Sequence, residues 1–222
     1  MGSRVHEPVE DRHVGQRHLD RLIMLSDGVF AIAITLSAIE IKPESSGGLT
    51  LWEAWSKPLL LYFLSFLLIG VIWANHRRIV AHLRDIDAVG TAINMVLLSL
   101  VALMPVVIRF SFEDTSQQEA FTIYAVAIAA TFSCMLVFWV YAAFIAKLAP
   151  DLDRATAREW LVQMILAPLA MLAAVLYEAQ IKSGALAITL AGVLLLMASR
   201  WFVRRRKADM TSDASDEGGG LG

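Results

Sequence analysis

The stretch that decides the fold reads Arg21-Leu-Ile-Met-Leu-Ser26-Asp27-Gly-Val-Phe-Ala-Ile-Ala-Ile-Thr-Leu-Ser-Ala-Ile39. Apart from Arg21 and the Ser26-Asp27 pair it is almost entirely apolar, and its length is close to the roughly 20 residues that a helix needs to cross a bilayer. An unpaired carboxylate inside such a run costs about 2.5–3.5 kcal/mol, so its presence indicates a specific role. The stretch therefore predicts a membrane-spanning helix that carries a polar site.

The rest of the chain has the same character. Of its 222 residues, 57% are hydrophobic and 18% are charged, whereas soluble domains average about 45–50% apolar and about 25% charged residues. The apolar runs are long and continuous, which favours helices over barrel strands that alternate over about ten residues. We therefore expect an all-α integral membrane protein with six transmembrane helices. The expected spans are residues 22–41, 58–76, 89–108, 120–147, 160–181 and 185–203.

The positive charges predict how these spans are oriented. Six spans place both termini on one side of the membrane, and 15 of the 19 Lys and Arg residues fall on that side. The positive-inside rule therefore predicts that both termini are cytoplasmic. We expect residues 1–20 to form a cytoplasmic N-terminal segment and residues 21–207 to form the six-helix domain. Residues 208–222 have almost nothing apolar to bury and are expected to be a disordered tail.

Several classes of protein are excluded by what the chain contains. A net charge of −2 argues against a nucleic-acid binder that works by bulk positive charge. A single cysteine, Cys134, excludes an intramolecular disulfide and a clustered-thiol metal site. Neither His-Glu-x-x-His nor Gly-x-Ser-x-Gly occurs, so we expect no enzyme, no cofactor and no bound metal.

Asp27 needs partners, and the second and third spans offer them. If the termini are cytoplasmic, Asp27 lies at a depth similar to that of Trp73, Asn75, His76 and Asn94. Indole, amide and imidazole N–H groups all donate to a buried carboxylate, which suggests a polar clasp that joins three helices. A simpler interpretation stays open, in which Trp73 belongs to an interfacial belt and His76 begins a loop.

The same first span carries an aliphatic stripe. At about 100° per residue, Leu25, Ile32, Leu36 and Ile39 fall on one side of the helix, with Thr35 at its edge. Most such stripes face lipid or pack inside the protein. If Asp27 points into its own protomer, however, the stripe must face either lipid or another subunit.

The first span closely resembles a family signature. The residues from Arg21 to Ser26-Asp27 resemble the Arg-x-x-x-Phe-Ser-Asp motif of the endolysosomal potassium channel family, and of its prokaryotic members in particular. Weaker similarities follow in Trp73-Ala-Asn75-His76 and in Asn94 with Met104-Pro105, so the resemblance covers roughly the first 110 residues. Leu25 stands where the motif has Phe, and Arg77 stands where relatives often have another His.

This resemblance implies an architecture and a set of site residues. It implies a homotetramer of six-helix protomers whose first helices line a central pore. It implies a pore constriction at Ile32 with further hydrophobic layers at Leu36 and Ile39, and a link between Thr35 and potassium preference. It also implies an interhelical polar network of Arg21, Ser26, Asp27, Asn75 and His76. With the donors Trp73 and Asn94 named above, the predicted network comprises Arg21, Ser26, Asp27, Trp73, Asn75, His76 and Asn94.

The function expected from these observations is a potassium-permeable, modestly selective cation channel of the leak type, closed by a hydrophobic constriction. Its expected partners are further copies of itself, membrane lipids and monovalent cations, with potassium as the permeant ion. A proton- or ion-coupled secondary transporter that uses Asp27 and His76 is the alternative. A membrane carrier of that kind places its binding site near the bilayer midplane, whereas Asp27 lies nearer one face.

Overall fold

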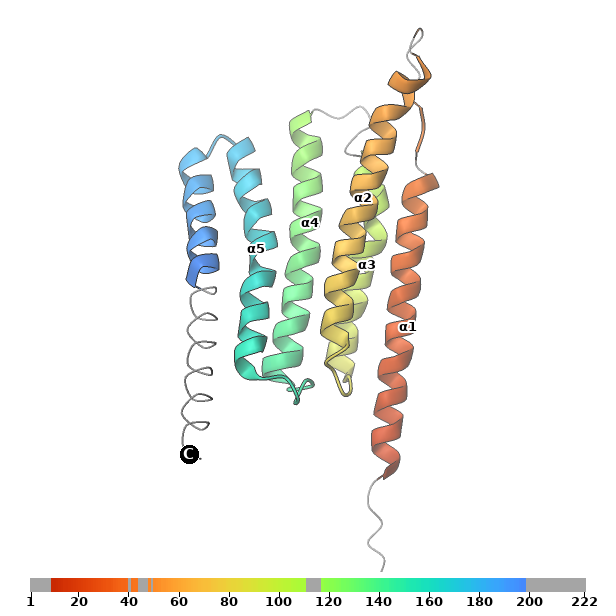
Figure 1. The fold of residues 1–222 in the computed structure, drawn as a ribbon, viewed down its shortest axis with the longest axis vertical. Coiled ribbons are helices and arrows are strands. Elements are labelled where there is room, and N and C mark those ends of the chain that lie inside the picture. Colours follow the sequence, from red (N-terminus) through yellow and green to blue (C-terminus); the bar gives the residue numbers. More distant parts are fainter. Residues whose placement is uncertain (1–8, 40, 44–47, 49, 111–116, 199–222) are drawn as a thin grey trace, which may run out of the picture.

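A computed structural model describes residues 9–39, 41–43, 48, 50–110 and 117–198, and the elements in this part of the chain are helices. Figure 1 shows long helices that run side by side, with the chain passing up and down between them. The helices are α1 (Val9–Ile39), α2 (Leu51–Val80), α3 (Ala88–Phe110), α4 (Gln117–Val140), the π-helical turn η1 (Tyr141–Ile145), α5 (Arg154–Glu178) and a last helix at Lys182–Ala198.

The prediction of an all-helical membrane protein is confirmed. Five helices are long and apolar enough to cross a bilayer, and the last helix is apolar but shorter in its described part. The predicted sixth span, 185–203, begins three residues later than this helix, and its end lies outside the described residues. The predicted tail at 208–222 also lies outside them, as does the start of the predicted N-terminal segment.

The helices begin before the predicted spans, most clearly α1, α2 and α5, and α5 begins at Arg154 where the apolar pattern predicts 160. α1 begins at Val9, so it extends well beyond the predicted span into the polar N-terminal segment. α2 begins at Leu51 because Thr50 and Glu53 form a capping box. The Thr50 amide donates to the Glu53 carboxylate at 2.8 Å, and the Glu53 amide donates to the Thr50 hydroxyl at 3.3 Å. Pro58 therefore lies inside α2, where neighbours can compensate for its missing N–H.

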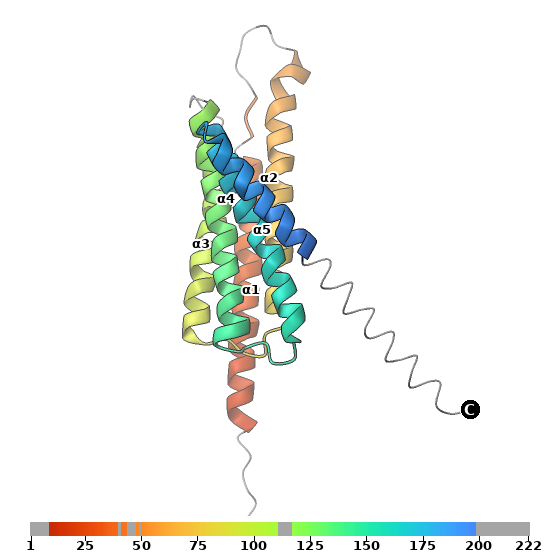
Figure 2. The same ribbon diagram turned by 90° about the vertical axis from the view of Figure 1, so that its left-hand side faces the viewer.

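The helices form a bundle with α3 in the middle of the packed region. α1 packs against α2 and α3, while α4 packs against α3 and α5. Leu97, Val101 and Met104 of α3 are almost completely buried between these neighbours. The last helix lies at the edge of the bundle opposite α1 in Figure 1, and Figure 2 shows it crossing the other helices at an angle.

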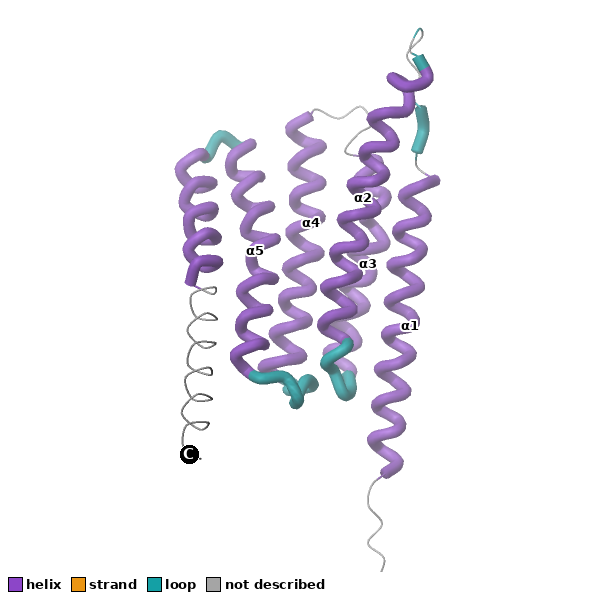
Figure 3. Tube along the Cα trace, in the orientation of Figure 1, coloured by secondary structure: helices purple, strands orange, loops and turns teal. Residues whose placement is uncertain are grey.

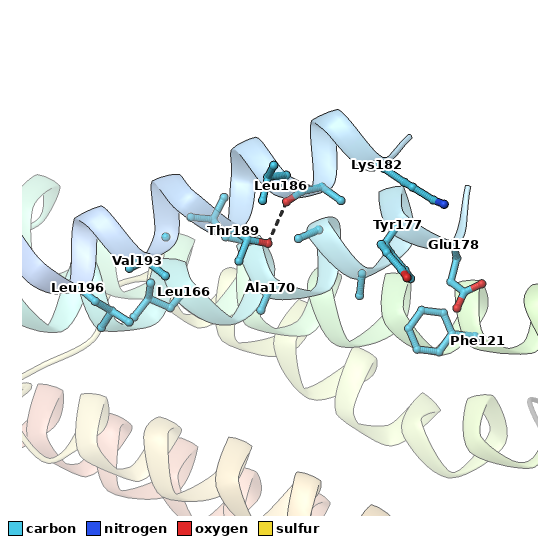
Figure 4. A pocket seen from close by; sticks show the side chains of 15 residues that line it. Phe121, Leu166, Ala170, Tyr177, Glu178, Lys182, Leu186, Thr189, Val193 and Leu196 are labelled. Carbon is cyan, nitrogen blue, oxygen red and sulfur yellow. Dashed lines mark hydrogen bonds between the residues drawn. The ribbon is translucent and has the colours of Figure 1, made fainter. Parts of the chain in front are cut away.

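The last helix packs loosely against α5. A groove of about 750 Å³ lies between the two helices and is lined mainly by small and aliphatic side chains. Figure 4 shows Ala170 of α5 and Thr189 of the last helix on its walls, with Tyr177 and Lys182 near one end. The alanine residues and Gly192 that line the groove leave this space unfilled, so the edge of the bundle is less tightly packed than its centre.

Two loops meet at the end of the bundle where α2 ends (Figure 3). The Arg84 amide donates to the Leu148 carbonyl at 3.0 Å, and the Arg84 guanidinium forms an ion pair with Asp151. Asp87 precedes α3, accepts a hydrogen bond from the Gly90 amide at 2.7 Å and is also contacted by the Tyr141 hydroxyl. These contacts connect the α2–α3 turn to the loop that leads into α5.

Candidate functional site

The α1 helix has a buried face that follows helical spacing. Leu22, Ser26, Phe30, Ala33 and Ser37 are all buried, and they recur every three or four residues along the helix. They face α2 and α3, the two helices against which α1 packs. The buried serines donate to backbone carbonyls one turn earlier, Ser26 to Leu22 at 2.8 Å and Ser37 to Ala33 at 3.0 Å. The buried face therefore has no unpaired hydroxyl.

The aliphatic stripe lies on another side of the helix and is uncovered in the protomer. Leu25, Ile32, Leu36 and Ile39 are 48%, 59%, 42% and 71% exposed. The Thr35 hydroxyl at its edge donates to backbone carbonyls of its own helix, at 2.9 Å to Ile32 and 3.1 Å to Ala31. Its oxygen lone pairs therefore remain available on the exposed side. Among the described residues, no side chain buries the stripe or Thr35, which together form one exposed surface.

Asn94 joins three helices through a directed chain of hydrogen bonds. The His76 Nε2 of α2 donates to the Asn94 Oδ1 at 2.7 Å, and the Asn94 amide donates to the Ser26 hydroxyl of α1 at 3.1 Å. Ser26 in turn donates to the Leu22 carbonyl. The carbonyl oxygen of an amide can only accept, so this arrangement puts the proton of the neutral imidazole on Nε2. All three side chains are at least 99% buried, and each is paired.

Two aromatic side chains enclose the His76 ring. Phe138 of α4 stacks on it with ring centroids 6.2 Å apart, and the Phe30 ring of α1 lies 5.5 Å away at a tilt. The sequence interpretation missed both residues. Phe30 follows Ser26 by four residues, so helical spacing alone could have found it, whereas no pattern in the sequence points to Phe138.

Asp27 belongs to a separate contact. Its carboxylate accepts a hydrogen bond from the Trp73 indole at 2.8 Å, which ties α1 to α2. The Arg77 guanidinium lies 5.4 Å from the centroid of the Trp73 ring. The polar residues therefore form two groups, Asp27 with Trp73 and His76 with Asn94 and Ser26.

Two residues of the predicted network have other surroundings. The Asn75 amide donates to the Val71 carbonyl within its own helix, at 2.8 Å. Arg21 is exposed on α1 and has no side-chain partner among the described residues. The structure thus brings five of the seven predicted residues into interhelical hydrogen bonds and leaves Arg21 and Asn75 outside them.

The paired polar side chains of this site have a structural role. Within the described ranges no three His, Cys, Asp or Glu side chains lie together to hold a metal ion. Cys134 is half-buried, with its Sγ directed at the Ile93 carbonyl at 3.8 Å. The paired side chains hold α1 in one rotational setting against α2 and α3. That setting determines which face of α1, the alkyl stripe, is presented outward.

The fold and the site together define a multi-pass, all-helical membrane protein whose first helix is fastened by buried hydrogen bonds. A family model described as "Endosomal/lysosomal potassium channel TMEM175" matches residues 21–105, which contain α2, nearly all of α3 and most of α1. This part of the chain is similar to that family, and the related proteins described below are bacterial.

Similar proteins extend this comparison. A potassium channel of Streptomyces collinus is 32% identical over 128 residues, which are 54% of this chain and 62% of that protein. A potassium channel of Chamaesiphon minutus is 38% identical over 100 residues, which are 40% of this chain and 47% of that protein. The chain thus matches less than two thirds of the length of either relative.

A solved structure resembles the fold over a longer range. It is the crystal structure of a lysosomal potassium-selective channel TMEM175 homolog from Chamaesiphon minutus. The similarity has a TM-score of 0.64 and 26% sequence identity, and it covers 83% of this chain and 99% of that chain. The likeness therefore includes the helices that follow the region matched by the family model.

Proposed function

We propose that this chain forms a potassium-permeable, modestly selective cation channel of the leak type. The observation that carries the proposal is the exposed alkyl stripe on α1, with Ile32 59% and Ile39 71% exposed in the protomer. The similarity to the potassium channels described above supports it. Potassium is the proposed permeant ion, and the proposal requires no cofactor.

The proposed assembly is a homotetramer with four α1 helices around a central axis. Closed rotational symmetry would bring the four copies of the stripe together and would cover the side chains that one protomer leaves exposed. Ile32, Leu36 and Ile39 would then form successive rings along the pore. Small residues on the same exposed side, Gly28 and Ala31, allow close approach of neighbouring helices.

The proposed constriction works by excluding water. An alkyl side chain cannot replace the hydration shell of an ion, so a narrow ring of Ile32 obstructs permeation mainly by dewetting. Opening must therefore widen this ring. Thr35 lies almost one turn after Ile32 and is the first oxygen-bearing side chain beyond it on this face, which supports its proposed role in potassium preference.

The proposed orientation places both termini in the cytoplasm of a prokaryotic cell. The excess of Lys and Arg on the side of the termini supports this orientation. The end of the bundle at which α2 ends and α5 begins would then be cytoplasmic, together with the loop contacts of Arg84 and Asp87.

The coupled-transporter alternative would need protons to pass between Asp27 and His76. Asp27 is bonded to Trp73 and His76 to Asn94, so the two titratable side chains belong to different hydrogen-bonded groups. The Trp73 indole can donate but cannot accept, which makes it a poor proton relay. The arrangement favours the channel over the carrier.

The Ile32→Asn variant tests the channel proposal. A polar ring at this position should hold water, so potassium flux into liposomes that contain the purified protein should rise by at least tenfold, equivalent to about 1.4 kcal/mol of barrier. Currents under opposed potassium and sodium gradients, recorded in planar bilayers, would measure selectivity in the same preparation.

The matched control is Leu190→Asn, which introduces the same side chain at an exposed aliphatic position of the last helix. Its flux should equal that of the wild type. Unchanged flux in Ile32→Asn, or an equal rise in both variants, would refute the constriction. Flux that depends strictly on a second ion would refute the channel and favour the transporter.

A further inference from the structure

A second site lies away from the α1 stripe, in a crevice between α2, α4 and α5. Its volume is about 300 Å³, roughly ten times the ~30 Å³ share of one water molecule in the liquid. Asn75, Arg78 and Gln163 line its polar part, and aliphatic, aromatic and thioether side chains line the remainder. The three helices that form it lie side by side in Figure 1. The crevice is therefore amphipathic.

The Arg78 guanidinium is held in place at this crevice. It lies 3.7 Å from the centroid of the Trp160 ring, and its Nη1 donates to the Gln163 carbonyl oxygen at 3.5 Å. Trp160 is itself packed against Trp139, with ring centroids 5.2 Å apart, and against the edge of His82 at 4.8 Å. The cation thus rests on a rigid aromatic surface.

The charge of Arg78 is available to a ligand. No carboxylate among the described residues forms an ion pair with it, and Gln163 uses only one of its five N–H donors. Glu159 is the nearby acid, and it accepts a hydrogen bond from the Gln163 amide at 3.4 Å. Guanidinium groups match the geometry of phosphate oxygens and bind them with two parallel hydrogen bonds.

The crevice also reaches from the headgroup level into the apolar part of the bundle, deep enough for the first part of an acyl chain. Arg78 lies two residues before the end of α2, and Val71 lies seven residues earlier on the same helix. At 1.5 Å per residue this separation is about 10 Å. The crevice therefore extends from the level of the helix end into the apolar part of the bundle, past Phe132 and Met164. Apolar cavities disfavour water and accept apolar molecules.

We propose that this crevice binds an anionic phospholipid. The phosphate would contact Arg78 and the amide groups of Gln163 and Asn75, and one acyl chain would lie along Val71, Phe132 and Leu166. A free phosphate ion would use the polar end alone, whereas a phospholipid uses both parts. The proposal requires insertion in a membrane and does not depend on ion conduction. In the orientation proposed above, the lipid comes from the cytoplasmic leaflet, where anionic headgroups bind basic pockets between helices.

Native mass spectrometry of the purified full chain tests this assignment. The protein is equilibrated with equal amounts of phosphatidylglycerol and phosphatidylcholine in detergent, and the lipid retained per protomer is counted. Wild-type protein should retain phosphatidylglycerol preferentially. Arg78→Gln should lower this preference about fivefold, the change expected for one arginine at an anionic surface.

The neighbouring arginine is the matched control. Arg77 also lies over a tryptophan, Trp73, but it does not line the crevice. Arg77→Gln should therefore keep the wild-type preference. Arg78→Lys should keep only part of it, because lysine retains the positive charge and loses the paired N–H donors of the guanidinium. Equal losses in Arg77→Gln and Arg78→Gln would indicate a general electrostatic effect and would overturn the proposal.

The apolar part of the crevice has its own test. Ala167→Phe fills the crevice without changing the charge, and it should reduce the retention of phosphatidylglycerol. Inorganic phosphate added without lipid should not raise the Tm of the wild-type protein, whereas phosphatidylglycerol should. If phosphate alone raises the Tm as much and Ala167→Phe retains lipid normally, the site binds a free anion and the lipid proposal is wrong.

Discussion

Asn94 is the residue on which the attachment of α1 depends most. Its amide is fully buried and serves both partners, as acceptor for His76 and as donor for Ser26. A hydrophobic side chain of similar size would leave the His76 ring without its hydrogen-bond partner and the Ser26 hydroxyl with its bond to the Leu22 carbonyl alone. Buried polar groups that lose their partners bear the full cost of their desolvation.

We expect Asn94→Ala to lower the free energy of unfolding by about 1–2 kcal/mol. The expected loss is this small because measured interhelical hydrogen bonds in membranes contribute less than the desolvation cost of an unpaired polar group. The loss would be measured as a lower Tm of the purified protein in detergent. Ser99→Ala is the control on the same helix, since Ser99 is exposed and bonds only to the Val96 carbonyl. Equal stability of the two variants would contradict the importance of the three-helix contact.

At the scale of the helix, the way in which each element begins and ends depends on local contacts. α3 begins after Asp87, whose carboxylate accepts from the Gly90 amide, and α2 begins with the capping box of Thr50 and Glu53. By contrast, the ion pair of Arg84 with Asp151 joins two side chains that are 61% and 69% exposed. Water and salt screen such a pair, so it contributes little to the free energy of unfolding.

This contrast predicts different effects for two neighbouring acids. Asp87→Ala should lower the free energy of unfolding by about 1 kcal/mol through loss of the α3 cap. Asp151→Ala should lower it by no more than about 0.5 kcal/mol, because it removes an exposed ion pair. Thermal unfolding at low salt, monitored by circular dichroism, would compare the two. A larger loss in Asp151→Ala would show that the ion pair stabilises this end more than the cap does.

At the scale of the whole molecule, a single protomer leaves the alkyl face of α1 exposed at one edge of the bundle (Figure 1). α1 is the first helix and the last helix lies at the opposite edge, so the two edges have different surroundings in any ring of protomers. In the proposed tetramer, the α1 edge is central and the edge with the last helix is peripheral, in contact with lipid.

Cysteine cross-linking tests this arrangement. In a Cys134→Ala background, Leu36→Cys should form disulfide-linked dimers under mild oxidation in membranes, because the central positions of neighbouring copies are close. Leu190→Cys, on the last helix, should remain monomeric on a denaturing gel. Cross-linking at Leu190 without cross-linking at Leu36 would place α1 on the outside and contradict the pore.

Much of the fold and part of the site follow from pattern alone. The apolar runs predicted the α3 span almost to the residue, 89–108 against Ala88–Phe110, because hydrophobicity is what the bilayer selects. The start of α2 was predicted seven residues late, because its capping box is a local hydrogen-bond feature and not an apolar one. The set of side chains that forms the alkyl stripe of α1 was also predicted, since helical spacing fixes which side chains share a side.

Contacts between helices were predicted less well. Depth along the membrane grouped Asp27, Trp73, Asn75, His76 and Asn94, but depth contains no information on the rotation of one helix against another. Tertiary packing separated this set into two pairs, Asp27 with Trp73 and His76 with Asn94. The Asn75 amide donates instead to a backbone carbonyl of its own helix. It also placed Phe138 on His76, a contact between residues 62 positions apart.

The sequence by itself determined that the chain is a helical membrane protein, where most of its helices lie, and which face of α1 is alkyl. These properties depend on the transfer of side chains from water to lipid and on helical periodicity, and both act on neighbouring residues in the chain. Only the tertiary structure decided which polar groups pair, how the crevice at Arg78 forms between three helices, and that the alkyl face stays uncovered in one protomer. Those properties depend on how distant helices pack, which no local pattern specifies.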